Sequence, residues 1–193
     1  MGDVLELTDK NALQVLDRYT VLACTPLYEE WRCKVTLDHD LPADTAGLVM
    51  ADVTRLPRLE IVNCSASLHF ARGLLIKSRG ALIEGNTFSD IPIAGIEGAA
   101  ESYWYEGVSP SDLVIRRNRI ENCGCGILIK ADCPDPKGLG IKNLVIEDNI
   151  INCPDARYGI YLRNVDGALI ARNRITVKGT PVFYENCANI KLD

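Results

Sequence analysis

A repeat centred on an asparagine restricts the possible folds of this chain more than any other feature. The later copies have two aliphatic residues, two linking residues, the asparagine, a spacer and another hydrophobic residue. The copies are EIVNCSA (60–66), LIEGNTF (82–88), VIRRNRI (114–120), VIEDNII (145–151) and LIARNRI (169–175). The shared position falls at Cys64, Asn86, Asn118, Asn149 and Asn173, at intervals of 22 to 32 residues. Such spacing predicts supersecondary units that stack on one another.

A second short, β-prone element follows each shared position. These elements are GLLIK (73–77), AGIEG (94–98), GILIK (126–130), GIYLR (159–163) and PVFYE (181–185). Helical solenoids need a period of 3.6 residues over ten or more residues of each repeat, and this period is absent. Several short strands in each repeat therefore predict a parallel β-solenoid of about five coils over residues 56–193.

The asparagines have a physical reason to recur. Stacked coils lie about 4.8 Å apart, so equivalent positions form a column. An asparagine at a bend can pair its amide with the backbone and with the asparagine of the next coil, which satisfies buried polar groups. We therefore expect replacement of Asn118 or Asn149 to reduce stability and to leave activity unchanged.

Residues 1–55 have a different pattern. Short strand-like runs (VLEL, YTVLAC, RCKVTLD and GLVMADV) are separated by turn-rich pieces such as TPLYEE and DLPADT. This pattern predicts a small antiparallel barrel or sheet before the solenoid.

Alternation along the second element predicts which side chains face outward. The expected outer column is Leu75, Glu97, Leu128, Tyr161 and Phe183. The two long insertions, residues 99–111 and 131–140, both follow this element. Insertions on one edge of a solenoid typically wall a binding groove.

The first insertion combines aromatic and acidic residues. Trp104 and Tyr105 lie between Glu101 and Glu106. Aromatic rings stack on the apolar faces of sugars, and carboxylates bind hydroxyl groups or transfer protons. In the alternative interpretation, the aromatic residues fold back and close the flank of the solenoid.

The candidate catalytic residues are the acids nearest this insertion. They are Glu97, Glu101 and Glu106, and the candidate substrate-binding residues are Trp104, Tyr105, Lys130, Asp132 and Arg163. Equivalent groups lie about 5 Å apart in adjacent coils and about 10 Å apart two coils away. Glycosidase carboxyls lie about 5 Å apart in retaining enzymes and about 6.5–9.5 Å apart in inverting ones. The alternative is that these residues are solvated surface charges or ion pairs.

Composition excludes several classes of partner and cofactor. The net charge of −5 argues against nucleic acid and anionic membrane surfaces as partners. The apolar runs are shorter than the roughly 20 residues that a membrane-spanning helix needs. Eight cysteines without a CxxC pair, and only two histidines, predict no metal or cofactor. Several cysteines recur in the repeats, which is typical of small buried hydrophobic residues; a disulfide framework is not expected.

Particular stretches resemble a known family. ARGLLIKSRGALIEGNTF (71–88), WYEG (104–107) and SDLVIRRNRIENC (111–123) are similar to right-handed parallel β-helix proteins, above all glycoside hydrolase family 110. KVTLDHDLP (34–42) and MADVTRLPRLEIVNC (50–64) are similar to the small barrel that leads into the helix in that family. The resemblance covers most of residues 30–180 and implies inverting hydrolysis of terminal α-1,3-linked galactose. Members of that family are several times longer, so we expect either a piece of a larger protein or ends covered by the barrel and by association.

Three functions remain open. The first is a glycoside hydrolase that uses carboxylate acid–base catalysis on a glycan or oligosaccharide. The second is a glycan-binding or structural solenoid without turnover, such as a homo-oligomer that associates through Leu75, Leu128, Tyr161 and Phe183. The third is a polysaccharide lyase. The start, MGDVLELTDK, is not a secretion signal, and the carbohydrate interpretation implies a secreted or periplasmic protein.

Overall fold

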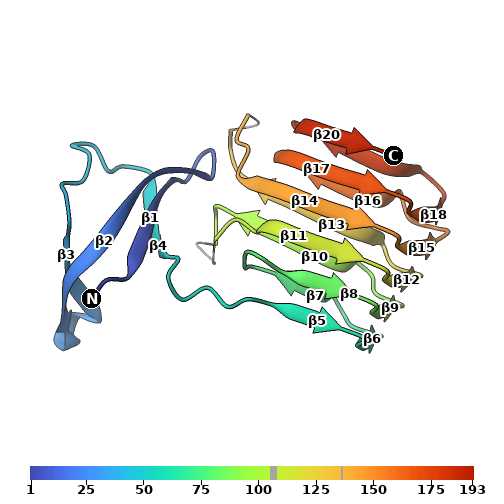
Figure 1. The fold of residues 1–193 in the computed structure, drawn as a ribbon, viewed down its shortest axis with the longest axis horizontal. Helices are drawn as coiled ribbons and strands as arrows, with labels where there is room; N and C mark the ends of the chain where they lie inside the picture. The colour runs from blue at the N-terminus through green and yellow to red at the C-terminus, as the bar shows by residue number, and fades with distance from the viewer. Residues whose placement is uncertain (105–107, 136) are drawn as a thin grey trace.

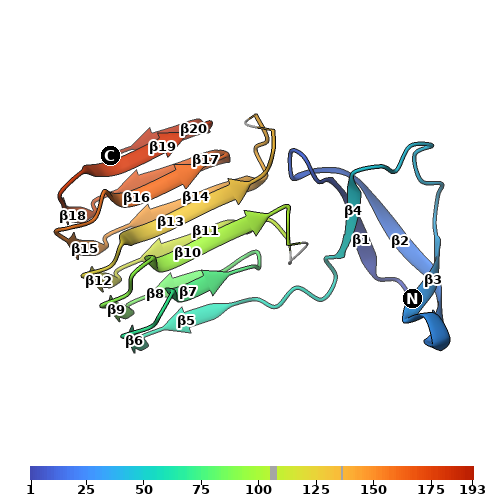
Figure 2. The ribbon, with the colours of Figure 1, turned by 180° about the vertical axis from the view of Figure 1, so that it is seen from behind.

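The computed structural model describes residues 1–104, 108–135 and 137–193. The chain forms a curled antiparallel sheet followed by a stack of parallel coils, which are shown from two sides in Figures 1 and 2. This confirms the predicted parallel β-helix and the β-rich segment before it. Among the described residues, no helix is long and apolar enough to cross a membrane.

The N-terminal sheet has the strand order β3-β2-β1-β4, with β3 and β4 at its open edges. The barrel-like segment expected from the sequence is therefore a curled open sheet. A short 3-10 helix, η1 (Tyr28–Glu30), joins β2 and β3. The strands are β1 (Val4–Asp9), β2 (Gln14–Leu27), β3 (Arg32–Leu37) and β4 (Leu48–Asp52).

Each coil contributes one strand to each of three parallel sheets, and the described strands β5 to β19 make five complete coils. Sheet 1 contains β5 (Glu60–Val62), β8 (Leu82–Glu84), β11 (Ser111–Arg116), β14 (Ile141–Glu147), β17 (Val165–Ala171) and β20 (Ala188–Leu192). Sheet 2 contains β6 (Ser65–Ser67), β9 (Thr87–Ser89), β12 (Arg119–Glu121), β15 (Ile150–Cys153) and β18 (Arg174–Val177). Sheet 3 contains β7 (Arg72–Ile76), β10 (Ala94–Glu101), β13 (Cys125–Asp132), β16 (Tyr158–Arg163) and β19 (Thr180–Glu185).

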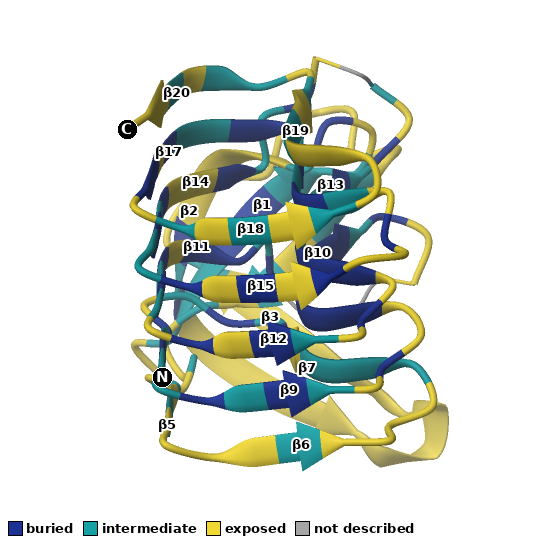
Figure 3. Ribbon diagram, turned by 90° about the vertical axis from the view of Figure 1, so that its right-hand side faces the viewer, coloured by how far each residue is buried: buried dark blue, intermediate teal, exposed yellow. Residues whose placement is uncertain are grey.

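Aliphatic side chains of the three sheets fill the interior of the stack. Because successive residues of a strand point to opposite faces, every second position turns inward. Ile115 of sheet 1, Ile120 of sheet 2 and Ile127 of sheet 3 are fully buried in the same coil. Burial is greatest in the middle coils, while β6 and β18 are more exposed (Figure 3). The core is therefore continuous along the stack axis.

The asparagine ladder is present as predicted. Asn118 donates from Nδ2 to Oδ1 of Asn149 at 3.0 Å and to the carbonyl of Ile83 at 2.9 Å. Its own Oδ1 accepts from the backbone N–H and from Nδ2 of Asn86, both at 2.9 Å. Asn149 bonds to Asn173 in the same way. Asn86, Asn118 and Asn149 are buried, so the ladder satisfies polar groups that have no access to water.

A buried carboxylate joins the N-terminal sheet to the helix. Glu6 of β1 is buried and accepts from Arg79 at 2.8 and 3.0 Å and from Arg18 at 2.9 Å. Arg79 also donates to the carbonyl of Ser109 in the first insertion. Burial raises the pKa of Glu6, but the hydrogen bonds and charges of Arg79 and Arg18 outweigh it, so the pKa lies below its usual value. The contact is therefore ionic at neutral pH.

Acid is expected to weaken this attachment. A carboxyl whose pKa is lowered on folding stabilises the folded state at pH values above its unfolded pKa, which is 4.5 here. This stabilisation is lost as the pH falls below that value and through the folded pKa. Glu6→Gln should therefore lower the free energy of unfolding at pH 7 by about 1–3 kcal/mol. The decrease in this free energy between pH 7 and pH 3.5 should also be smaller than in the wild type. Urea denaturation at pH 7 and at pH 3.5 measures this. Glu60→Gln, which removes an exposed pair with Arg58, is the control; an equal loss in both variants would contradict the prediction.

Candidate functional site

The two long insertions leave the helix at the same corner, as predicted. Residues 99–111 join β10 to β11, and residues 131–140 join β13 to β14, so both pass from sheet 3 to sheet 1 on the side of the N-terminal sheet (Figure 1). Asn164 anchors the second insertion by donating to the carbonyl of Ala131 at 3.2 Å. Further along, the N–H of Asp135 donates to the carbonyl of Asn11, in the turn between β1 and β2.

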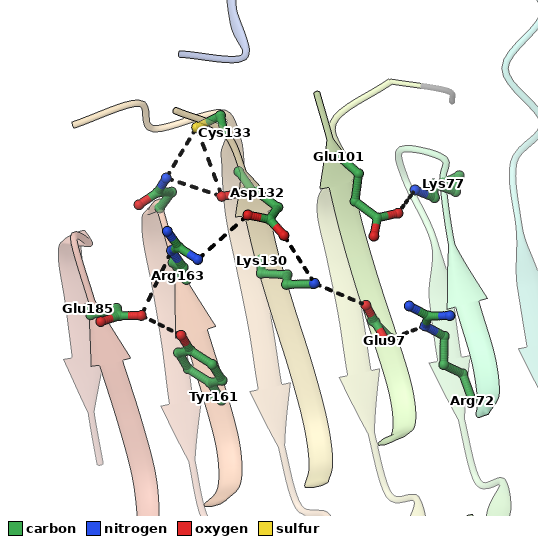
Figure 4. A network of polar contacts seen from close by, with 12 residues as sticks. Arg72, Lys77, Glu97, Glu101, Lys130, Asp132, Cys133, Tyr161, Arg163 and Glu185 are labelled. Atoms are coloured by element: carbon green, nitrogen blue, oxygen red, sulfur yellow. Dashed lines mark hydrogen bonds and ion pairs between the residues drawn. The ribbon is translucent and has the colours of Figure 1, made fainter. Parts of the chain in front are cut away.

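The outer face of sheet 3 carries the candidate site, shown in Figure 4. The predicted outer column is in register across the five strands, and its members are Leu75, Glu97, Leu128, Tyr161 and Phe183. Lys130, Arg163 and Glu185 form a neighbouring column, and Glu101 pairs in register with Asp132. Parallel pairing thus brings to one face charged residues that are far apart in the sequence.

Glu97 lies on this face but is shielded from solvent. Its side chain is 1% exposed, and its carboxylate binds the guanidinium of Arg72, with the ammonium of Lys130 at 4.0 Å from the other oxygen. That oxygen, Oε1, has no hydrogen-bond partner among the described residues. A buried carboxylate between two cations fixes both of them. Glu97 therefore sets the positions of Arg72 and Lys130.

Arg72 is a residue that the sequence analysis did not include in the site. Strict alternation places it inside, but Gly73 lies against the core residues Phe88 and Ile91. Because Gly73 and Leu74 both face the interior, Arg72 turns outward and binds Glu97. A side chain at Gly73 would collide with Ile91 and with the carbonyl of Gly95, so only glycine fits there. Gly73, the second residue of β7, was the available signal for this break in alternation.

Glu101 lies at the end of β10 and is held as an anion. The ammonium of Lys77 donates to its Oε2 at 2.6 Å. This hydrogen bond, together with the charges of Lys77 and Lys130, keeps the pKa of Glu101 below its usual value despite its partial burial. Glu101 is therefore ionised under mildly acidic conditions as well as at neutral pH.

Asp132 is the counterpart of Glu101 on the adjacent strand. The two residues pair in register across β10 and β13, which places their backbones about 4.8 Å apart. Asp132 is 37% exposed and lies between Lys130 Nζ at 3.5 Å and Arg163 Nη1 at 3.7 Å. The two carboxylates therefore occupy equivalent places in successive coils, at the mouth of both insertions.

Three aromatic rings continue the same face. Tyr158 stacks on Phe183 with centroids 4.7 Å apart, and Tyr161 packs against both at 5.2 and 5.5 Å. Tyr161 donates its hydroxyl to Glu185, and burial together with this hydrogen bond raises the pKa of Tyr161 to about 12. Alternation along the strands predicts Tyr161 and Phe183 on this face, whereas Tyr158 was not predicted there.

The aromatic residues of the first insertion are only partly described. Trp104 is 69% exposed, so it does not fold back onto the flank of the solenoid. Tyr105 and Glu106, which were predicted as a binding and a catalytic residue, lie outside the described residues. Within the described part of the predicted site, ion pairs link Glu97, Lys130, Asp132 and Arg163 in one chain, and Glu101 pairs with Lys77 beside it (Figure 4).

Four of the eight cysteines lie inside the stack. Cys123, Cys125, Cys133 and Cys153 are buried, as expected for small hydrophobic residues, and the thiols are free. Burial and the thiol of Cys153 raise the pKa of Cys123. Within residues 1–104, 108–135 and 137–193, no group of three or more His, Cys, Asp or Glu side chains is placed to hold a metal ion.

The fold is a parallel β-helix with a charged and aromatic outer face, and sequence comparison relates the chain to glycoside hydrolases. The chain is 34% identical over 181 residues to alpha-1,3-galactosidase A of Bacteroides thetaiotaomicron, a match that covers 90% of this chain and 32% of the relative. It is 30% identical over 154 residues to alpha-1,3-galactosidase B of the same organism, covering 73% of this chain and 25% of the relative. No protein-family model matches the chain.

The chain is thus related to the alpha-1,3-galactosidases, which confirms the resemblance to glycoside hydrolase family 110. It spans about a third of the length of the first of these relatives and a quarter of the second.

Proposed function

We propose that the outer face of sheet 3 is the site of a glycoside hydrolase that cleaves terminal α-linked galactose from a glycan. The relationship to two alpha-1,3-galactosidases supports the reaction. The observation that carries the location is the pairing of Glu101 with Asp132 in adjacent coils, because glycoside hydrolysis uses two carboxyl groups within one site.

The environments of the two carboxyls suggest different roles. Glu101 is kept ionised by Lys77 and serves as the carboxylate that activates the attacking water. Asp132, the more exposed of the pair, is assigned the other role, protonation of the leaving oxygen. Glu97 acts as a positioning residue through Arg72 and Lys130.

The remaining residues of the face recognise the sugar. Lys130 and Arg163 are placed to donate hydrogen bonds to sugar hydroxyls, because carboxylates hold both cations in defined positions. The stacked rings of Tyr158 and Phe183 provide a flat apolar surface for a second sugar unit.

Hydrolysis of anomeric aryl galactosides tests this function. The chain should release p-nitrophenol from the α-galactoside and not from the β-galactoside, and galactose from an α-1,3-linked digalactoside. Proton NMR of the first product reports whether the anomeric configuration is inverted. Absence of galactose release at micromolar protein over one day would overturn the proposal. Ultraviolet absorbance on pectin would instead reveal an unsaturated product of a lyase.

Removal of Lys77 should shift the acid limb of the activity profile. Lys77→Met deletes the hydrogen bond that lowers the pKa of Glu101, so this pKa rises toward its usual value. A general base works only when ionised, and the acid limb of kcat/KM therefore moves to higher pH, while the rate on the neutral plateau changes less. The measurement is the pH profile of kcat/KM for the α-galactoside. A variant whose acid limb coincides with that of the wild type would show that Glu101 is not the base.

A second candidate function is glycan binding without turnover, which the aromatic cluster favours. Phe183→Ala removes the ring that stacks on Tyr158 and should weaken glycan binding roughly tenfold. Calorimetry with the digalactoside measures this. Phe70→Ala is the control, because Phe70 is 93% exposed and outside the described site. Binding without product release would select this function over the hydrolase.

A further inference from the structure

A cavity of about 520 Å³ lies between the N-terminal sheet and the corner of the helix that carries the first insertion. One wall comes from β1 and β4, through Thr8 and residues 49–52. The opposite wall comes from the end of β10 and the described part of the insertion, through Ala100, Glu101 and Ser102. Its volume is within the range of small-molecule sites in proteins.

Ser102 contributes a buried side chain to this wall. The residue is 3% exposed, and its Oγ has no hydrogen-bond partner among the described residues. Its backbone N–H donates to the carbonyl of Asp132 at 3.1 Å, which fixes the residue at the end of the strand pair. An unpaired buried hydroxyl is unfavourable, so a ligand that offers it a hydrogen bond gains affinity.

The other lining residues indicate the chemistry of the ligand. Two carboxylates, Asp52 and Glu101, and two cations, Lys10 and Arg79, line the cavity together, so no sign of charge predominates. The remaining described lining is largely aliphatic and includes Leu13, Val49, Leu56 and Val108. Balanced polar groups beside an aliphatic wall suit a neutral ligand with several hydroxyl groups and one apolar face, which describes a hexopyranose.

Glu101 connects the cavity with the outer face of sheet 3. The same residue lines the cavity, binds Lys77, and pairs in register with Asp132. A sugar that enters the cavity therefore presents the bond to the next sugar unit close to both carboxyls. The rest of the glycan can extend across sheet 3 toward Tyr158 and Phe183.

We propose that this cavity binds the terminal hexopyranose of the glycan, with Ser102 Oγ as a specific hydrogen-bond partner; this assignment rests on the proposed function. The N-terminal sheet is thereby part of the sugar site, and it closes the end of the cavity beyond the terminal sugar unit. The site accepts the last unit of a chain and excludes internal units.

Filling the cavity from the wall opposite Glu101 tests this inference. Ala51→Trp places an indole at a lining position of β4, and Ser102→Ala removes only the hydroxyl. Ala23→Trp is the matched control, because it adds the same indole to an exposed position of β2 outside the lining. Galactose is the probe: calorimetry gives its Kd, and the α-galactoside gives KM and kcat.

The expected results separate the variants. Ala51→Trp should abolish detectable galactose binding and raise KM for the α-galactoside at least tenfold, whereas Ala23→Trp should match the wild type. Ser102→Ala should weaken galactose binding about threefold to tenfold, as expected for one neutral hydrogen bond, with an unchanged thermal midpoint. Ser102→Ala leaves the size of the wall almost unchanged, so it keeps the test valid if Ala51→Trp does not fold.

Failure of this inference differs from failure of the proposed function. If Ala51→Trp folds and both it and Ser102→Ala retain wild-type galactose affinity and KM, the cavity assignment is wrong while the hydrolase stands. If the wild type binds galactose in a manner blocked by Ala51→Trp but releases none from α-galactosides, the hydrolase is wrong and the cavity remains a sugar site.

Discussion

Glu101→Gln is expected to lower kcat for α-galactoside hydrolysis by about 10²–10⁴-fold and to change KM much less. The amide keeps the size of the side chain and accepts the hydrogen bond from Lys77, but it cannot take a proton from water. Asp132→Asn should cause a loss of similar size, because the displacement needs a general acid as well as a general base. Steady-state kinetics and the thermal midpoint of each variant measure these effects.

Glu84→Gln is the matched control for both substitutions. Glu84 lies on sheet 1, away from the candidate site, and binds Arg116 and Arg117. Its side chain is 19% exposed, compared with 14% for Glu101, so the two substitutions disturb similar environments. An equal fall in kcat for Glu84→Gln would attribute the losses to destabilisation. Wild-type kcat in Glu101→Gln would remove Glu101 from the mechanism.

Asn118→Ala should produce the largest loss of stability, about 2–5 kcal/mol. It leaves the backbone N–H of Asn86 and the carbonyl of Ile83 without their ladder partner, and it breaks the link to Asn149. These groups are buried in the middle of the stack, where water does not replace the lost bonds. Urea denaturation measures the change in the free energy of unfolding.

Asn152→Ala provides the comparison for the ladder. Asn152 is an exposed residue of β15, and its replacement should change stability by less than about 0.5 kcal/mol. The kinetic constants of folded Asn118→Ala should remain close to those of the wild type, because Asn118 lies far around the coil from sheet 3. A loss below about 1 kcal/mol for Asn118→Ala would contradict the ladder as a source of stability.

The repeating part of the fold could be predicted because the same physical requirement returns in every coil. Each buried bend needs an amide, and each strand needs an inward aliphatic residue. The sequence positions of Asn118 and Ile127 therefore predict a buried bend and an inward-facing strand position. The outer column followed from alternation in the same way, and it placed Glu97 and Tyr161 on one face. Parallel register then determined that Lys130 and Arg163 are neighbours.

The environment of the site residues was less predictable. Alternation gives the direction of Glu97 but not its burial, which depends on Arg72 and Lys130 from the two neighbouring strands. The attachment of the N-terminal sheet depends on Glu6 and Arg79, which are 73 residues apart and belong to no repeat. The cavity beside that contact was therefore not visible in any periodic pattern. Long-range pairs that occur once leave no recurring signal in a single sequence.

The asparagine ladder has a consequence for how such a molecule can change. Each rung is fixed by the side chain of the next one, whether the two asparagines are 24 or 32 positions apart in the sequence. Segments between rungs can therefore be lengthened, shortened or exchanged while the spacing of the stack is conserved. A lineage built on this frame can acquire new binding preferences by replacing the corner loops, without having to redesign its interior.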